Sequence, residues 1–110
     1  MDVRRGNVVL IVLPGELGKP RPGVVVQSDG IDQQRTTIVC PLSSDVTDAP
    51  TLRPIIEPSR SNGLRARSQI MVEKLAAVRQ TRIRKVVGTL DRDDQAALDG
   101  ALLIILGLTA

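Results

Sequence analysis

The sequence predicts a small, mainly β domain with a single helix at its C-terminal end. Short runs of β-branched residues alternate with turns containing Gly, Pro or Asp from residue 7 to residue 87. After Asp91 the apolar residues recur at helical spacing instead. A length of 110 residues suits one domain, and 42% hydrophobic residues is enough for a folded core.

The predicted strands are short, and the most apolar of them are nearly continuous in hydrophobicity rather than alternating. Such runs are typical of strands that are covered on both faces or lie in a closed sheet. Pro41 suggests that the pairing of the third strand ends there, because proline has no N–H to donate. A short basic turn or helix is expected between the last two strands. The predicted strands are Asn7–Leu13, Arg21–Gln27, Thr36–Leu42, a weaker Arg53–Ile56, Gln69–Leu75 and Arg84–Val87.

The last segment has the start and stop signals of a helix. Asp91 can cap its N-terminus, Asp93 and Asp94 lie in the positively polarised first turn, and Gly107 suits the C-terminal end. Apolar residues form one face and then widen it beyond a single stripe. Such a helix packs deep against the sheet or is covered by a second subunit, which favours a homodimer. The apolar positions are Leu98, Ala101, Leu102, Leu103, Ile104, Ile105 and Leu106.

Four residue types, Phe, Trp, Tyr and His, do not occur in the chain. Without histidine, Ser-His-Asp and Cys-His catalysis are excluded, and Cys40 alone cannot build a zinc site of the His and Cys kind. Bases cannot be stacked on aromatic rings. Any catalysis must therefore use Arg, Lys, Asp, Glu, Ser, Thr or the backbone.

The net charge of +3 is unevenly distributed. Residues 60–85 contain eight Lys or Arg and one acidic residue, so this segment carries +7 and the rest of the chain −4. A basic segment in a moderately charged domain suits an anionic partner such as RNA or DNA, although a solvated surface gives the same pattern.

The cysteine count and the apolar runs indicate a compartment. A single cysteine cannot form an internal disulfide, which favours a reducing cytoplasm. No signal-peptide pattern is visible, and no wholly apolar run is longer than 101–106, which is much shorter than a membrane-spanning helix. The sequence therefore predicts a cytoplasmic protein without a membrane segment.

Four short motifs follow one another along nearly the whole chain, from about residue 5 to residue 108. Together, although none is unique, they resemble the MazF/PemK-like toxin family. They are Arg5-Gly6-Asn7-Val8-Val9, then Pro14 to Pro22 followed by the valine-rich 24–28, then Val39-Cys40-Pro41-Leu42-Ser43-Ser44, and finally Gly88-Thr89-Leu90-Asp91 before the last helix.

The resemblance implies a single toxin domain over residues 1–110, with an SH3-like small β-barrel of the MazF/CcdB type and a C-terminal helix, that forms a homodimer. Family members are mostly ribonucleases that cut single-stranded RNA at short sequences without a metal, and a cognate antitoxin holds them inactive. The resemblance therefore implies an endoribonuclease toxin that needs no cofactor. Attack by the 2′-hydroxyl would leave a 2′,3′-cyclic phosphate and a 5′-hydroxyl.

The resemblance assigns catalysis to Arg21 and Ser43. A guanidinium at a loop–strand junction can stabilise the charge of the phosphorane, and a proton-transfer role is proposed for the family's matching Arg. Ser43 matches the family's catalytic Thr or Ser, with Ser44 as the alternative register, although a Ser here can also simply close a turn. Glu16 lies in the loop before Arg21 and is a candidate for the base, for orienting the Arg, or for an exposed loop charge.

Binding roles follow for a few neighbouring polar residues. Lys19 is expected to contact phosphate, while Gln27 and Ser28 are expected to read base edges near the end of their strand. Cys40 is expected to be a small buried core residue rather than a nucleophile. The acidic residues that open the last helix suit its N-terminus better than a metal site, so no metal ligand is assigned.

The chain also departs from the family pattern. Asn7 replaces the usual Asp of the opening motif, Arg67 stands where members often have an Asp, and Ala76-Ala77 replace a common Arg-Thr. Arg21 and Ser43 are unaffected, so these departures bear mainly on which RNA is recognised.

Two other functions remain open at this point. The related CcdB toxins poison DNA gyrase, but they use a Trp near the chain end that this sequence lacks. A catalytically degenerate module would bind an antitoxin or nucleic acid without turnover.

Overall fold

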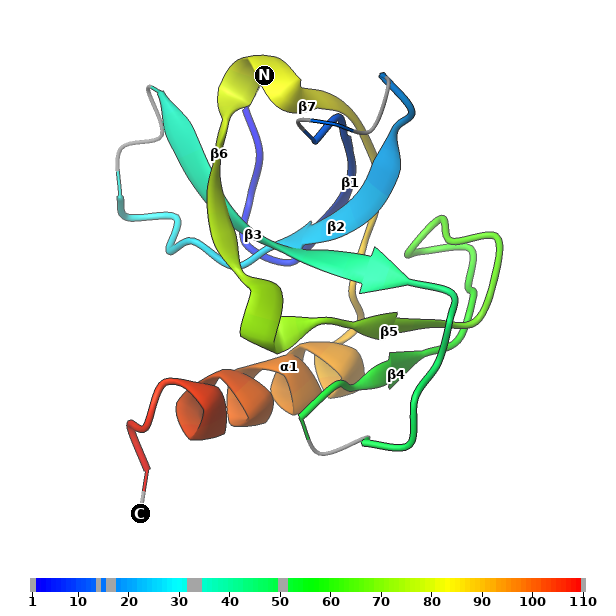
Figure 1. The fold of residues 1–110 in the computed structure, drawn as a ribbon, viewed down its shortest axis with the longest axis vertical. Coiled ribbons are helices and arrows are strands. Elements are labelled where there is room, and N and C mark those ends of the chain that lie inside the picture. Colours follow the sequence, from blue (N-terminus) through cyan, green and yellow to red (C-terminus); the bar gives the residue numbers. More distant parts are fainter. Residues whose placement is uncertain (1, 14, 16–17, 32–34, 50–51, 110) are drawn as a thin grey trace.

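The chain forms a curled antiparallel sheet with one α-helix packed against it (Figure 1). The computed structural model describes residues 2–13, 15, 18–31, 35–49 and 52–109. The predicted mainly β fold with a C-terminal helix is confirmed. Within the described residues the elements are β1 (Asn7–Ile11), β2 (Arg21–Val25), β3 (Thr36–Ser43), β4 (Ile55–Ile56), β5 (Ser68–Ile70), β6 (Ala76–Arg79), β7 (Ile83–Thr89), the 3-10 turns η1 (Val72–Lys74) and η2 (Gln80–Arg82), and α1 (Arg92–Ile105).

Strand β3 is the centre of the sheet. It pairs with β2 along one edge, while its other edge pairs first with β6 and then with β5. The prediction that pairing ends at Pro41 is wrong, since Leu42 pairs with Ile70 of β5. The Pro41 carbonyl accepts from Met71 N (2.8 Å), so the Pro41 nitrogen faces the edge of β3 along which β6 and β5 pair. Pro41 lies between the residues that pair with β6 and those that pair with β5, so neither strand requires an N–H from it.

The predicted strand Gln69–Leu75 is divided in the structure. Strand β5 ends at Ile70, and η1 follows as a turn in which Lys74 N donates to the carbonyl of Met71 (3.0 Å). Strand β6 then occupies part of the stretch expected to be a basic turn or helix, and η2 the rest. β6 begins with two alanines, which have a low strand preference. Its backbone pairing with β3, rather than the preference of its side chains, therefore makes this segment a strand.

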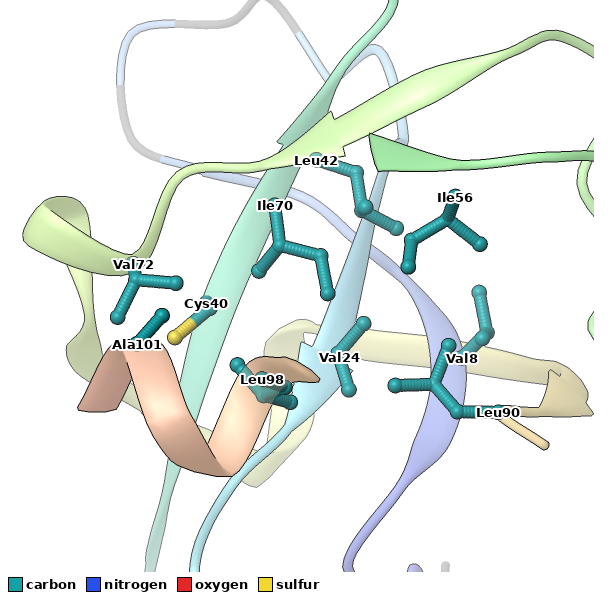
Figure 2. Packing of buried hydrophobic residues seen from close by; sticks show 10 residues of the cluster. All are labelled: Val8, Val24, Cys40, Leu42, Ile56, Ile70, Val72, Leu90, Leu98 and Ala101. Atoms are coloured by element: carbon teal, nitrogen blue, oxygen red, sulfur yellow. The ribbon is translucent and has the colours of Figure 1, made fainter. Parts of the chain in front are cut away.

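Both faces of the sheet formed by β1, β2 and β3 are buried, by two separate groups of apolar side chains. Neighbouring residues such as Val8 and Val9 belong to different groups, which explains the continuous apolar runs. Leu98 and Ala101 of α1 point into the first group (Figure 2). The second group lies inside the curl of the sheet. The helix-side cluster comprises Val8, Val24, Cys40, Leu42, Ile56, Ile70, Val72, Leu90, Leu98 and Ala101, and the interior cluster Val3, Val9, Ile11, Val25, Val39, Val78 and Ile83.

Helix α1 begins where the sequence predicted. The Asp91 side chain accepts from Asp94 N (2.8 Å), and Gly107 follows the helix with a φ of 70°. Arg5, just before β1, donates to Asp99 Oδ1 (2.6 Å) and so joins the start of the chain to the helix. Among the described residues, no helix is long and apolar enough to cross a membrane.

Candidate active site

A groove of about 1040 Å³ lies at the end of the sheet where β2 begins and β3 ends. Its walls come from β1, β2, β3 and β7 and from the segment 63–66 between β4 and β5. Leu42 belongs both to this lining and to the helix-side cluster, so the groove begins where that cluster stops. The polar and charged side chains of the lining are Lys19, Arg21, Ser43, Ser44, Asp45, Arg65, Ser68 and Lys85.

Arg21 and Ser43 lie on the paired strands β2 and β3, each two residues beyond the last pair of their register. In that pair, Gly23 of β2 is opposite Pro41 of β3. Residues two apart in a strand project from the same face. Both side chains line the groove, so the fold brings together the two residues to which the resemblance assigned catalysis.

The Ser43 hydroxyl is oriented by its own turn. Its oxygen accepts a hydrogen bond from the backbone N–H of Asp45 (3.1 Å), which leaves the hydroxyl proton available to an acceptor in the groove. Ser43 is half-buried and Ser44 is exposed, and both line the groove. The turn role and the donor role that the sequence suggested for Ser43 are therefore compatible.

The other predicted site residues do not all reach this groove. Lys19 lines it, whereas Glu16 lies outside the described residues. Gln27 is only 7% exposed, and its Oε1 accepts from Ile38 N (3.1 Å). Ser28 is exposed, and its hydroxyl accepts a backbone N–H within its own turn. The base-reading role predicted for Gln27 and Ser28 finds no support in the described lining.

Sequence reasoning missed three charged residues of the groove, Asp45, Arg65 and Lys85. The excess of positive charge over residues 60–85 was visible, and all eight of its basic residues are described. Only Arg65 and Lys85 among these eight line the groove. Which of these basic residues line the groove depends on the pairing of β7 and on the loop after β4. Counting charges in the sequence does not show this.

The loop that carries Arg65 is held tightly against β7. Asn62 is 2% exposed; its Oδ1 accepts from the backbone N–H groups of Ser59 (3.0 Å) and Leu64 (2.9 Å), and its amide nitrogen donates to a third backbone group. Gly63 has a φ of 69°, and a Cβ there would lie 2.2 Å from a backbone oxygen of β7. Only glycine fits this position, so the loop can approach β7 this closely two residues before Arg65.

The structure also bears on Cys40 and on metal binding, the two other kinds of chemistry discussed from the sequence. Burial raises the pKa of the Cys40 thiol to about 12, which suits the predicted core role and leaves no thiolate at neutral pH. Among the described residues, no group of three or more His, Cys, Asp or Glu side chains lies close enough to hold a metal ion.

The residues that depart from the family pattern are not among the described lining residues of the groove, although Arg67 lies between two of them, Ala66 and Ser68. Asn7 accepts from Arg4 N (2.7 Å) and donates to Thr89 Oγ1 (3.2 Å). Arg67 forms an exposed ion pair with Glu57 (3.3 Å). The two alanines of β6 are exposed on a strand that pairs with β3.

Comparisons with known proteins show the family to which the chain belongs. A model of the family described as PemK-like, MazF-like toxin of type II toxin-antitoxin system matches residues 4–106. The probable endoribonuclease MazF of Mycolicibacterium smegmatis is 36% identical over 107 residues, which are 96% of this chain and 98% of that protein.

Solved structures share the fold at lower identity. A mycobacterial endoribonuclease in complex with its cognate antitoxin has a TM-score of 0.81 at 15% identity, covering 99% of both chains. The Mycobacterium tuberculosis toxin MazF-mt6 has a TM-score of 0.79 at 17% identity, covering 94% of this chain and 99% of that one. Since the family model spans nearly the whole chain and the MazF relative is more than one-third identical, the chain belongs to the PemK-like, MazF-like family of toxins of type II toxin–antitoxin systems.

Proposed function

We propose that this MazF-family endoribonuclease toxin cuts single-stranded RNA in the groove between β2 and β3, without a metal ion. The observation that carries the proposal is that Arg21 and Ser43 line one groove, each two residues beyond the Gly23–Pro41 pair of β2 and β3. Cleavage begins when the 2′-hydroxyl attacks the adjacent phosphorus. The bond to the 5′-oxygen then breaks, which leaves a 2′,3′-cyclic phosphate and a 5′-hydroxyl.

Two groups stabilise the phosphorane as negative charge accumulates on its oxygens. The Arg21 guanidinium supplies positive charge and paired N–H donors, and the Ser43 hydroxyl donates to a phosphoryl oxygen. The 2′-hydroxyl must also lose a proton and the leaving 5′-oxygen must gain one. Glu16 and Arg21 are the candidates for these transfers, and Arg21 is the weaker base because a guanidinium holds its proton strongly.

RNA binding in the groove relies on charge and hydrogen bonds, since the chain has no aromatic side chain on which bases can stack. Lys19, Arg65 and Lys85 line the same groove as Arg21, and in this proposal they contact phosphates. Each phosphate contact with single-stranded RNA contributes about −0.7 to the slope of log affinity against log salt. Arg65→Ala is therefore expected to weaken RNA binding and to make that slope shallower by about 0.7, as measured by titration at several salt concentrations. An unchanged slope would remove Arg65 from the binding surface.

The catalytic assignment is tested with Arg21→Ala and Ser43→Ala on a long single-stranded RNA in EDTA. Loss of a charge-stabilising donor is expected to lower kcat by about a hundredfold or more while the thermal unfolding temperature stays unchanged. Arg92→Ala is a matched control, because it removes an exposed arginine from α1, away from the groove. Ser44→Ala separates the two serines. Full cleavage by Arg21→Ala would contradict the assignment, and binding without cleavage by the wild-type protein would favour the degenerate module.

The proposal includes a cytoplasmic site of action and a small antitoxin as partner. An extended or acidic segment of the antitoxin would cover the basic groove and exclude RNA. Structural relatives solved with their cognate antitoxin support this idea, since they share the fold of this chain. No described feature favours the gyrase-poison alternative, and the MazF relative is described as an endoribonuclease.

The proposal also includes a homodimer, in which each copy is a single domain over residues 1–110. The end of α1 and the residues after it leave large apolar side chains exposed: Leu103 and Ile104 are each 46% exposed and Leu108 is 69% exposed. A second copy of the chain would cover such a surface. Ile104→Lys is expected to shift the protein from dimer to monomer in light scattering. A wild-type monomer at micromolar concentration would contradict the dimer.

A further inference from the structure

A single buried glutamine connects the groove to the loop that follows β3. Gln69 of β5 is completely buried, and it stands directly opposite Ser43 in the pairing of β5 with β3. Burying a polar amide is costly unless its hydrogen bonds are made. The partners of this amide therefore indicate why a polar side chain occupies the position.

The Gln69 amide binds the backbone of Thr47 in both directions. Its Oε1 accepts from Thr47 N (2.8 Å) and from Thr47 Oγ1 (3.1 Å). Its Nε2 donates to Thr47 O (2.9 Å) and to Arg53 O (3.3 Å). Both acceptor positions and both donor positions of the amide are used, so it imitates a neighbouring strand for one residue of the loop.

These bonds form a closed path that includes the candidate catalytic serine. Ser43 pairs with Gln69, Gln69 binds Thr47, and Thr47 lies two residues beyond Asp45, whose N–H donates back to Ser43 Oγ. A second tether lies further along the loop, where the Arg53 side chain donates to Glu73 Oε1 (3.0 Å) and thereby lowers the pKa of Glu73.

We propose that Gln69 is the positioning residue of the active site, which holds the Ser43–Asp45 wall of the groove in place through Thr47. The inference rests on the proposed function, because Ser43 is the group being positioned. Gln69 does not touch RNA. It acts by fixing the turn that directs the Ser43 hydroxyl, and small displacements of such a group are costly in rate, with about 1 Å corresponding to about a hundredfold.

Gln69→Met tests this role, because it keeps the length and much of the volume of the side chain and removes its hydrogen bonds. We expect kcat to fall by about ten- to a hundredfold while KM for RNA changes little, since the basic residues of the groove remain. Gln80→Met is the control: Gln80 is a partly buried glutamine whose Nε2 donates to Thr37 Oγ1 (3.4 Å) at the other end of the sheet, and kcat should be unchanged. A folded Gln69→Met variant with wild-type kcat would overturn the proposal.

Gln69→Glu adds a readout that a merely structural role would not change. The introduced carboxyl can both accept and donate when protonated, but it only accepts when ionised, and its burial raises its pKa. Relative to wild type, kcat should therefore recover as the pH is lowered, with unfolding monitored at each pH. A kcat ratio that does not depend on pH would count against the role of the Nε2 donor.

Hydrogen exchange of the wild-type protein tests the hydrogen bonds between Gln69 and Thr47, here called the clamp. This test depends neither on RNA cleavage nor on the folding of a variant. The Thr47 amide is expected to exchange about a hundredfold or more slowly than an unprotected amide, although Thr47 is an exposed loop residue. Exchange at the unprotected rate would overturn the clamp. Absence of RNA cleavage by the wild-type protein would instead contradict the proposed function, and the Thr47 measurement would still decide whether the clamp exists.

Discussion

The paired strands β2 and β3 differ between their two ends. Near Val24 and Cys40 they are covered by Leu98 of the helix, and these side chains are fully buried. Near Arg21 and Ser43 the same two strands line an open groove. The strands are shared, so the difference lies in what covers them: the helix packs over Val24 and Cys40, whereas Arg21 and Ser43 line the groove. The covered end should carry stability and the open end chemistry, and substitutions should separate the two properties.

The largest expected effect on stability comes from the covered end. Leu98→Ala removes a fully buried side chain from the helix-side cluster, so the free energy of unfolding should fall by about 2–5 kcal/mol. The folded fraction should keep its kcat, in contrast to Arg21→Ala. Denaturant unfolding with parallel RNA cleavage measures both. If Leu98→Ala lost activity at wild-type stability, the division between the two ends would be broken.

An intermediate effect is expected where the groove wall meets β7. Gly63→Ala forces a side chain onto a positive φ and against a backbone oxygen, which should cost about 1–3 kcal/mol of unfolding free energy. Gly100→Ala is the matched control, because a Cβ at this helical position meets nothing within 4 Å, and alanine favours a helix by roughly 0.5–1 kcal/mol. Equal stability of these two variants, measured by thermal unfolding, would contradict the close approach at Gly63.

The smallest effect is expected at the ion pair between Arg5 and Asp99. Burial raises the pKa of Asp99, but hydrogen bonds from Arg5 and Gln95 outweigh it and hold the pKa below its usual value. Such a depressed pKa contributes stability above the unfolded pKa of about 3.9, and this contribution is lost as the pH falls through the lower folded value.

Asp99→Asn should therefore reduce the free energy of unfolding at pH 7 by no more than about 1 kcal/mol, since both side chains are partly exposed. The difference from wild type should disappear on acidification below pH 4. A difference that stays constant with pH, measured by denaturant unfolding at each pH, would mean that the carboxylate charge is not the cause.

Much of the fold was predictable because its signals are local. The covered strands appear as continuous apolar runs, and the Asp91 cap marks the helix start within one residue. Strand β6 was missed because its alanines carry no strand signal and its backbone pairing with β3 is long-range. The end of strand pairing was mispredicted at Pro41 for a related reason. Whether its missing N–H interrupts the pairing depends on which strand lies opposite that nitrogen, and the local sequence does not show this.

The candidate site was predictable only in part. The resemblance identified Arg21 and Ser43, and both line one groove in the structure. Arg65 and Lys85 were hidden within a uniformly basic stretch, because nothing in the sequence says which of eight cations face one groove. Gln69 reads as an ordinary strand residue, and its four hydrogen bonds depend on a loop more than fifteen residues earlier in the chain.

The most direct test of the proposed mechanism is to map the RNA ends produced by the purified protein in EDTA. A long single-stranded RNA should yield fragments with 5′-hydroxyl and 2′,3′-cyclic phosphate ends at a short recurring sequence, and Arg21→Ala should yield almost none. Fragments with 5′-phosphate ends, or equal cleavage by Arg21→Ala, would contradict a metal-independent 2′-hydroxyl attack carried by Arg21.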